Sequence, residues 1–225
     1  MSFAPLPEAF CRRAAHWADL PVCRLVDLGC GDGDVGQWLS PYGLEAFGLD
    51  RLPLGAATKL AIRGDALRPP LRPGRLDGVL AVNLVPHALA QDPSGLFLER
   101  WLDLLKPDGW LFLVGDQACG TRDPAVRNYQ KLQAFLAEIV PQWRGPLVSG
   151  QQIVARLEQA GARNIRWGVE PNAGKPDTEA VLTMLAGTGN TRPAGPADRL
   201  ARSIRRDGLS LGRYWWVEAQ PSTGS

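Results

Sequence analysis

Apolar positions recur along this chain with two different periods. Short, nearly continuous apolar runs favour strands buried on both faces; they occur at 24–28, 45–49, 59–63, 76–83, 164–169 and 213–219, with one more run ending at Gly115 and Asp116. Apolar residues three or four positions apart favour helices; they occur at 7–20, 34–40, 94–105, 127–140, 151–159, 179–185 and 198–206. This succession of strands and helices is typical of an α/β protein.

Local signals refine three of these elements. Ser94 and Asp177 are residue types that cap helix N-termini, so we expect them to begin the helices at 94 and near 179. The segment 179–185 is compatible with either a strand or a helix, and its apolar spacing favours a helix. The turn residues at 107–109 predict a turn between the helix at 94–105 and the strand that follows.

The stretch 25–33, which reads LVDLGCGDG, is the most informative part of the chain. An apolar run leads into Asp27, and glycine then occupies every second position from Gly29 to Gly33. Because glycine has no Cβ, such a turn lets the backbone come close to another molecule. The first turn of the helix at 34–40 has N–H groups without partners inside the helix. We therefore expect a binding site for a polar small molecule, with these free N–H groups directed at the ligand.

Two cofactor classes fit this turn. Residues 31–36 match the Gly-x-Gly-x-x-Gly fingerprint of dinucleotide-binding proteins, and Asp50 follows at about the expected 20 residues. The pattern Asp27-x-Gly29-x-Gly31-x-Gly33 instead resembles the first motif of the class I S-adenosylmethionine-dependent methyltransferases. Carboxylates beside the turn attract the sulfonium and ammonium groups of S-adenosylmethionine but repel a pyrophosphate. We therefore favour the methyltransferase interpretation over a nicotinamide or flavin cofactor.

Later motifs extend the resemblance across residues 25–113. In this family, an acid in the position of Asp50 would accept from both ribose hydroxyls, a role that dinucleotides also require. The segment 64–67 resembles the pattern in which Asp65 accepts from the adenine amino group and the next N–H meets a ring nitrogen. The segment 105–113 resembles the motif before the fifth strand. From this resemblance we expect the following residues to bind the cofactor: Asp27, Gly29, Cys30, Gly31, Asp50, Arg51, Asp65, Ala66 and Asn83. We interpret Cys30 as a small residue chosen for its size.

The resemblance implies a Rossmann-like α/β fold, with a seven-stranded mixed sheet whose last strand is antiparallel and with helices on both faces. Within this single domain, residues 1–22 would form a helix that covers the sheet or acts as a lid, and 23–170 would form the cofactor-binding core. Residues 171–212 would form a helical insertion, and 213–225 the final strand and tail. The implied reaction is in-line displacement at the methyl group of S-adenosylmethionine by a nucleophilic O, N, C or S, leaving S-adenosylhomocysteine.

The residues around the methyl acceptor are less defined. His87 follows the fourth strand, where small-molecule methyltransferases of this type often place a histidine, and a neutral imidazole can accept a proton. A hydrogen bond to the loop is the alternative role. We expect the acceptor among the N-terminal helix, His87, the region from Asp116 to Tyr129, and the insertion 171–212.

A small-molecule acceptor is the favoured interpretation, because the chain shows no added RNA-binding domain. The main alternative is an RNA or protein methyltransferase that uses the arginine-rich segment 198–213, although these arginines also fit a solvated helix face. A nicotinamide-dependent oxidoreductase and a non-catalytic cofactor-binding module are further alternatives.

Composition limits the domain size, the binding partners and the cellular location that we expect for the protein. The 225 residues are 45% apolar with a net charge of +2, which suits one domain with a substantial core and gives no general attraction to nucleic acid or acidic membranes. Four cysteines without paired spacing and two histidines disfavour a metal site. No signal-peptide pattern is seen, and no apolar run approaches the ~20 residues that span a bilayer. We therefore expect a cytoplasmic monomer or homodimer.

Overall fold

The computed structural model describes residues 6–31, 34–51, 60–117, 122–139, 145, 148–172, 174, 176–187 and 195–222. The expectations for Asp32, Gly33, most of the linker 187–195 and the tail beyond residue 222 therefore lie outside the described residues. Within the described residues, none of the helices is both long enough and apolar enough to cross a membrane.

Seven strands within the described residues form a single sheet in the order β3-β2-β1-β4-β5-β7-β6. The strands are β1 (Leu25–Leu28), β2 (Ala46–Asp50), β3 (Ala61–Arg63), β4 (Leu76–Val82), β5 (Leu105–Asp116), β6 (Arg163–Pro171) and β7 (Arg213–Gln220). The pairs from β3 to β5 are parallel, whereas β7 runs antiparallel to both β5 and β6. This confirms the predicted seven-stranded mixed sheet with an antiparallel last strand.

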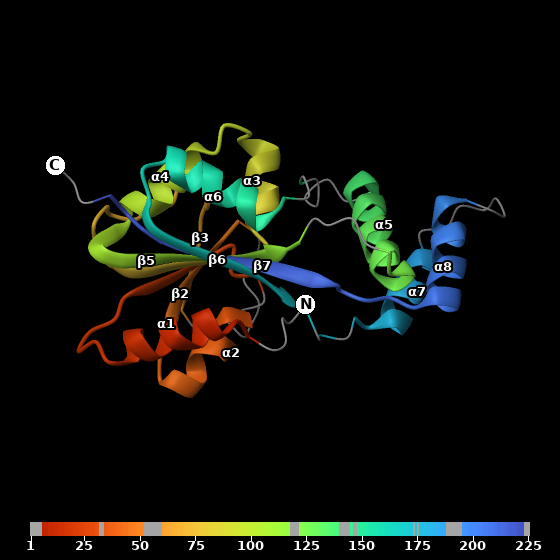
Figure 1. Ribbon diagram of the computed structural model, residues 1–225, viewed down its shortest axis with the longest axis horizontal. Helices are drawn as coiled ribbons and strands as arrows, with labels where there is room; N and C mark the ends of the chain where they lie inside the picture. The colour runs from red at the N-terminus through yellow and green to blue at the C-terminus, as the bar shows by residue number, and fades with distance from the viewer. Residues whose placement is uncertain are drawn as a thin grey trace.

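Helices cover both faces of this sheet (Figure 1). One face carries α1 (Glu8–Ala18) and α2 (Asp34–Leu39), followed by the short 3₁₀ helix η1 (Ser40–Tyr42). The other face carries α3 (Val85–Gln91), α4 (Leu96–Asp103) and α6 (Gly150–Gln159). Because successive strand residues point to opposite faces, Phe112 packs with the α1 side of the core and Leu111 with the α4 side.

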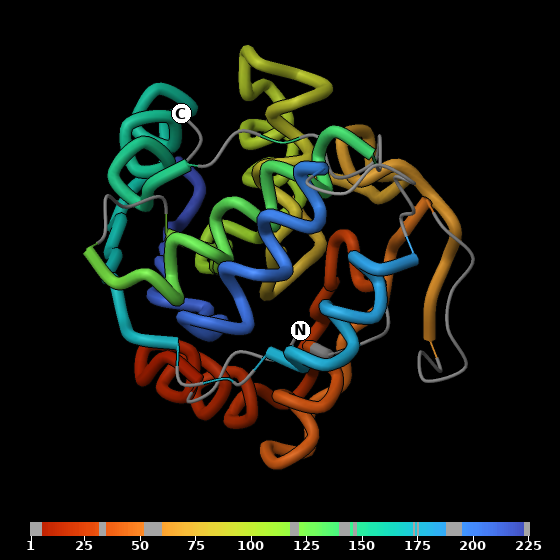
Figure 2. Tube along the Cα trace, turned by 90° about the vertical axis from the view of Figure 1, so that its right-hand side faces the viewer, coloured from red at the N-terminus to blue at the C-terminus, as the bar shows by residue number. Residues whose placement is uncertain are grey.

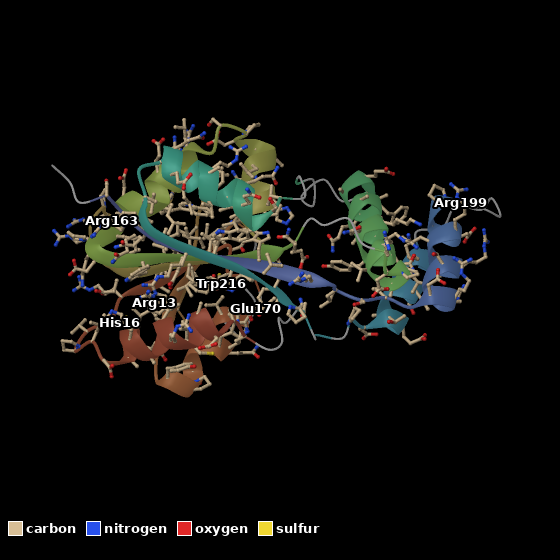
Figure 3. The ribbon with its side chains drawn as sticks, viewed as in Figure 1. Arg13, His16, Arg163, Glu170, Arg199 and Trp216 are labelled. Carbon is tan, nitrogen blue, oxygen red and sulfur yellow. The ribbon has the colours of Figure 1, made fainter. Side chains whose placement is uncertain are left out.

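An ion pair fixes α1 to the sheet. The Arg13 guanidinium donates to Glu218 Oε2 on β7 from Nη2 at 3.0 Å and from Nε at 3.3 Å. Both side chains are largely withdrawn from solvent, and Arg13 also stacks 3.5 Å from the ring centroid of Trp110. Figure 3 shows Arg13 between α1 and the sheet. Removing one partner of such a buried pair typically costs about 3–5 kcal/mol. These contacts favour the interpretation of α1 as a cover of the sheet.

Three helices gather beyond the carboxyl ends of the parallel strands, and we call them the helical cap. They are α5 (Pro124–Ile139), α7 (Thr178–Gly187) and α8 (Pro196–Asp207), and they share an apolar core of their own. Viewed from that side, α5 and α8 lie side by side in front of the sheet (Figure 2). The segment predicted at 179–185 is thus a helix, and Asp177 accepts from the Ala180 N–H at 2.9 Å as a cap should.

Three local predictions were wrong. Helix α3 was not expected, although Val85, Ala88 and Leu89 have helical spacing and are buried. Ser94 does not cap α4, because Ser94 donates to Asp92 and the helix begins only after Gly95, whose φ is 81°. The segment 106–109 forms no separate turn but belongs to extended β5, where the register with β4 shifts.

Candidate cofactor site

The glycine turn after β1 has the backbone that its sequence predicts. Gly29 and Gly31 have φ values of +69° and +46°, which residues with a Cβ rarely adopt. The N–H groups of Gly29 and Cys30 donate to the Leu49 carbonyl of β2 at 2.7 and 3.3 Å. The end of β1 is therefore tied directly to the end of β2.

Asp50 closes the turn from the other side. Its Oδ2 accepts from the Gly31 N–H at 3.0 Å. The N–H groups from Gly29 to Gly31 are therefore already bonded within the protein. The expectation of free N–H groups at the start of the following helix stays a prediction. Asp50 thus holds the turn in shape as well as lining the cavity beside it.

Asp27 and Cys30 lie beneath the turn. Asp27 is 4% exposed and Cys30 is 7% exposed. Burial, with the nearby charges of Asp27 and Asp50, raises the pKa of the Cys30 thiol to about 12. Cys30 therefore stays an uncharged thiol at neutral pH, which supports its interpretation as a small residue chosen for its size.

A cavity of about 70 Å³ adjoins the turn at the carboxyl edge of the sheet. Five of the predicted cofactor residues line it, and these are Gly29, Asp50, Arg51, Asp65 and Ala66. The cavity lining does not include the other four, which are Asp27, Cys30, Gly31 and Asn83. The structure thus brings five of the predicted residues, from the ends of β1, β2 and β3, together around one cavity.

Arg51 spans this cavity. Its Nη2 lies 2.9 Å from Asp65 Oδ2, and its Nη1 donates to Gln91 Oε1. The other Asp65 oxygen, Oδ1, accepts from the Leu67 N–H at 3.0 Å. The carboxylate predicted to receive an adenine amino group is therefore occupied by protein donors in this structure.

The loop that carries Asp65 is held by α4. Trp101 Nε1 donates to the Ala66 carbonyl at 2.7 Å, and Arg100 donates to the Leu67 carbonyl at 3.0 Å. Because Trp101 is fully buried, this side of the cavity is attached to the rigid core.

Helix α3 contributes residues that the sequence prediction missed. Leu84, just before the helix, and Ala88 and Gln91 within it line the cavity. A Cβ on Gly29 would come within 2.8 Å of Leu84 Cδ1, so the glycine allows this close packing. The apolar spacing of Val85, Ala88 and Leu89 was the signal that could have revealed the helix.

Asn83 and Asp116 link the ends of β4 and β5. Asn83 has a left-handed φ of 54°, and its Oδ1 accepts from the Asp116 N–H at 3.3 Å. Asp116 Oδ2 in turn accepts from the Tyr129 hydroxyl at 2.7 Å. Burial raises the pKa of the Asp116 carboxyl, whereas the bond from Tyr129 opposes the shift.

His87 lies on α3, outside the cavity lining. Its carbonyl accepts from the Gln91 side-chain amide at 3.3 Å, and its side chain is half-buried. A Cβ on Gly145 would come within 2.5 Å of the neighbouring Pro86 carbonyl oxygen, so residue 145 packs closely over the start of this helix. A catalytic role for His87 stays a prediction.

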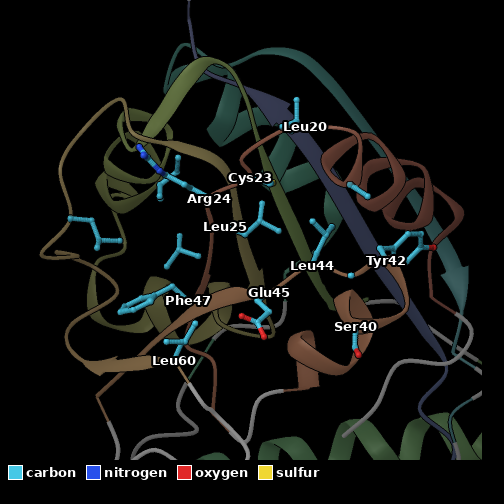
Figure 4. Close-up of a pocket in the computed structure, with 15 residues that line it drawn as sticks. Leu20, Cys23, Arg24, Leu25, Ser40, Tyr42, Leu44, Glu45, Phe47 and Leu60 are labelled. Carbon is cyan, nitrogen blue, oxygen red and sulfur yellow. The ribbon is translucent and has the colours of Figure 1, made fainter.

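A larger cavity of about 830 Å³ lies at the opposite, amino edge of the sheet (Figure 4). Its walls include Cys23 and Leu25 from β1 and the segment before it, Tyr42 from η1, and Phe47 from β2. No residue predicted to bind the cofactor lines it. Ligands of open α/β sheets bind outside the carboxyl ends of the strands, so the smaller cavity is the candidate cofactor site.

The carboxylates in and beside the smaller cavity fit a nucleoside that carries a positively charged group. Asp50 and Asp65 supply acceptors for hydroxyl and amino groups, and Asp27 adds a buried carboxylate beside the turn. The free volume is below the range of about 300–1,000 Å³ usual for small-molecule sites. The bridge that Arg51 forms between Asp65 and Gln91 is part of this lining.

Comparison with known proteins bears on this arrangement. A family model described as "Methyltransferase domain" matches residues 26–113, which run from β1 into β5. No curated protein matches the chain in sequence.

Solved structures share the fold at low sequence identity. A SAM-dependent methyltransferase from Archaeoglobus fulgidus is 18% identical, with a TM-score of 0.59 over 94% of this chain and 92% of that chain. The YcgJ protein from Bacillus subtilis is 15% identical, with a TM-score of 0.64 over 95% and 99%. Phosphoethanolamine N-methyltransferase 2 from Haemonchus contortus, crystallised with phosphomonomethylethanolamine and S-adenosylhomocysteine, is 17% identical, with a TM-score of 0.56 over 95% and 52%.

The sheet order separates the two cofactor classes that the glycine turn left open. Doubly wound dinucleotide-binding sheets have the order 3-2-1-4-5-6, whereas here an antiparallel β7 lies between β5 and β6. In its sheet order and in the methyltransferase-domain match over residues 26–113, the chain is similar to the class I S-adenosylmethionine-dependent methyltransferases.

Proposed function

We propose that this protein is a methyltransferase that transfers the methyl group of S-adenosylmethionine to a small-molecule nucleophile held beneath the helical cap. The observation that carries the proposal is the convergence of Asp50 and Asp65 on one cavity beside the glycine turn. When bound, S-adenosylmethionine supplies an electrophilic methyl group on a positively charged sulfur.

The chain's own residues would bind and orient the two reactants. Asp50 would accept from the ribose hydroxyls, Asp65 from the adenine amino group, and Asp27 would lie nearest the charged methionine end. Much of the rate of such a transfer can come from alignment alone. The ends of β4 and β5, where Asn83 and Asp116 meet, would then face the acceptor.

The position of the helical cap favours a small acceptor. Helices α5 and α8 lie across the carboxyl edge (Figure 2), so an acceptor must fit between them and the strand ends. One solved structure that shares this fold is a small-molecule N-methyltransferase. The arginines of α8 are exposed on its outer side, as Figure 3 shows for Arg199, while Leu200 and Ile204 are buried in the cap. That pattern is typical of a solvated helix face.

Calorimetry tests the cofactor class. We expect S-adenosylmethionine and S-adenosylhomocysteine to bind and NAD not to bind. Asp50→Asn should weaken S-adenosylhomocysteine binding by about tenfold or more, because hydrogen bonds to a charged group contribute about 1.5–3 kcal/mol. Asp103→Asn, an exposed carboxylate on α4, is the matched control. Binding of NAD without binding of S-adenosylmethionine would refute the proposal.

A further inference from the structure

Asp116 and Tyr129 form a hydrogen-bonded pair between the sheet and the helical cap. Asp116 ends β5, and Tyr129 comes from α5, where its side chain is 4% exposed. The Tyr129 hydroxyl donates to Asp116 Oδ2 at 2.7 Å. Asn83 Oδ1, at the end of β4, accepts from the Asp116 backbone N–H at 3.3 Å. The pair is thus held from two neighbouring elements.

The strand alternation places Asp116 on the same face of the sheet as Asp27. Phe112 and Val114 pack on the α1 face, so Asp116 follows them on that face. Leu25 also packs there, so Asp27 at the end of β1 has the same orientation. Asp27 is in register with Leu80 on β4, which is in register with Phe112 on β5. Asp116 therefore lies two strand spacings, about 10 Å, to the side of Asp27 and four residues, about 13 Å, farther toward the carboxyl edge. A cofactor held near Asp27 would therefore have Asp116 on its far side.

The surroundings of Asp116 suit proton transfer at this position. Among the described residues, Tyr129 is the ionisable side chain that forms a hydrogen bond with the Asp116 carboxylate. Asn83, which accepts from the Asp116 N–H, has a neutral amide. From β7, Arg213 turns its guanidinium to the Val169 carbonyl at 3.2 Å. Burial raises the pKa of Asp116, and burial with the Asp116 charge raises the pKa of Tyr129. The phenol therefore remains a donor while the carboxylate is the group that accepts a proton.

We propose that Asp116 is the general base of the reaction, that Tyr129 positions it, and that the acceptor is an amine or a hydroxyl compound. This rests on the proposed function. The acceptor must carry a hydrogen on its nucleophilic atom, because the carboxylate needs a donor to bind. A thioether sulfur carries no such hydrogen, and the C–H group of a carbon acid is only a weak hydrogen-bond donor to a carboxylate.

The step balances with the groups named. The acceptor's lone pair on N or O forms the new bond to the methyl carbon, and the S–CH₃ bond breaks with its electron pair remaining on sulfur. The N–H or O–H proton passes to the Asp116 carboxylate, which becomes a neutral carboxylic acid and later releases the proton to solvent. The positive charge of the sulfonium and the negative charge of the carboxylate disappear together.

The first test needs neither cofactor nor acceptor. In protein with ¹³C-labelled aspartate carboxyls, one resonance, absent from Asp116→Asn, should titrate above the ordinary aspartate range near 3.9. Tyr129→Phe should move that resonance to still higher pH, because it removes the hydrogen bond that stabilises the carboxylate. Tyr42→Phe, at the opposite edge of the sheet, is the matched control. An Asp116 that titrates at its ordinary pKa, unaffected by Tyr129→Phe, overturns the assignment.

The second test uses turnover. S-adenosylhomocysteine release is measured with a panel of small primary amines, alcohols and phenols, and with thioethers and carbon acids for comparison. With the fastest amine or hydroxyl compound, Asp116→Asn should lower kcat by about 100-fold or more with little change in KM. Tyr129→Phe should shift the acid limb of the kcat profile to higher pH. Asp103→Asn and Tyr42→Phe should stay within about twofold of wild type.

Calorimetry separates failure of this inference from failure of the proposed function. Asp116→Asn should bind S-adenosylmethionine within about twofold of wild type, which also shows that it folds. Turnover of carbon or thioether acceptors alone, or an Asp116→Asn variant with wild-type kcat, overturns the inference while leaving the cofactor class intact. Loss of cofactor binding in the wild-type protein would instead remove the proposed function.

Discussion

Arg51 lines the proposed cofactor cavity. Its guanidinium is 53% exposed and bridges Asp65 to Gln91. A partly exposed ion pair of this kind contributes only about 0.2–1 kcal/mol. A ligand that bonds Asp65 can therefore displace Arg51 at small cost, and the bridge is compatible with a working site.

Arg51→Ala should bind S-adenosylhomocysteine about two- to fivefold more tightly, because the substitution frees the Asp65 carboxylate from its competing partner. Calorimetry at low and high salt measures the change, and added salt should narrow the difference between wild type and variant. Arg68→Ala, in the loop that follows Asp65, is a control. Weaker binding by Arg51→Ala would show instead that Arg51 contacts the nucleoside directly.

Asp116 should make stability depend on pH in a defined direction. Burial raises its folded-state pKa above the unfolded value, so its contribution to stability is complete below that unfolded value and is lost as pH rises through the folded pKa. Asp116→Asn carries no charge and should avoid that loss. The Tm difference between variant and wild type should therefore grow from acid to neutral pH. A difference that is constant with pH, as expected for Asp103→Asn, would contradict the raised pKa.

For single residues of the site, the sequence predicted the backbone angles and the place at the cavity better than the hydrogen-bond partners. The positive φ angles of Gly29 and Gly31 follow from the absence of Cβ, and Asp50 was expected at the cavity because it ends a strand. The bonds that now occupy Asp50 and Asp65 come from Gly31 and Arg51. Their geometry depends on how the strand ends are spaced, which no local pattern of residues encodes.

At the scale of elements, the helical cap is held by a buried amide. Asn128 is 1% exposed, and its Nδ2 donates to the Ser203 and Gly208 carbonyls at 3.1 and 2.9 Å. Ser203 Oγ donates back to Asn128 Oδ1 at 2.7 Å. Asn128 precedes Tyr129, so the same turn of α5 contacts both α8 and Asp116. The cap and the proposed base are therefore mechanically connected.

Asn128→Ala should leave buried groups of α8 without partners and cost about 1–3 kcal/mol. Hydrogen exchange should show faster exchange in α8 while β1 and β4 keep their protection, because the core does not depend on this amide. Lys131→Ala, on the exposed face of α5, is the matched control. Equal protection of α8 in both variants would mean that its apolar contacts alone hold the cap.

Elements with one strong local pattern were predicted well, whereas the packing of helices against partners distant in sequence was not. The seven strands follow from apolar runs, and the antiparallel direction of the last strand was implied by the family resemblance. The predicted domain division put 127–140 in the core and 171–212 in an insertion, yet α5 packs with α7 and α8. An amphipathic helix specifies an apolar face but not the surface it packs against, so this grouping could not be derived from periodicity.

The whole molecule has different surfaces at its two sheet edges. The carboxyl edge carries the acidic cofactor cavity and the helical cap, while the outer side of α8 carries exposed arginines (Figure 3). With a net charge of only +2, the protein has no general attraction for polyanions. The arginines therefore matter for function only if a phosphate-bearing or acidic partner binds that side.

The double variant Arg202→Glu, Arg205→Glu should leave small-molecule methylation unchanged, because both arginines lie on the exposed side of α8. Wild type should show no salt-sensitive binding to a single-stranded RNA oligonucleotide in an anisotropy titration. Binding that falls with salt and disappears in the double variant would favour an RNA methyltransferase.

A crystal structure of the complex with S-adenosylhomocysteine is the decisive measurement for the proposed cofactor site. We expect density beside Gly29, with the ribose at Asp50, the adenine at Asp65 and the Arg51 side chain withdrawn from its bridge. Density in the 830 Å³ cavity at the amino edge, with Arg51 still bound to Asp65 and Gln91, would contradict it.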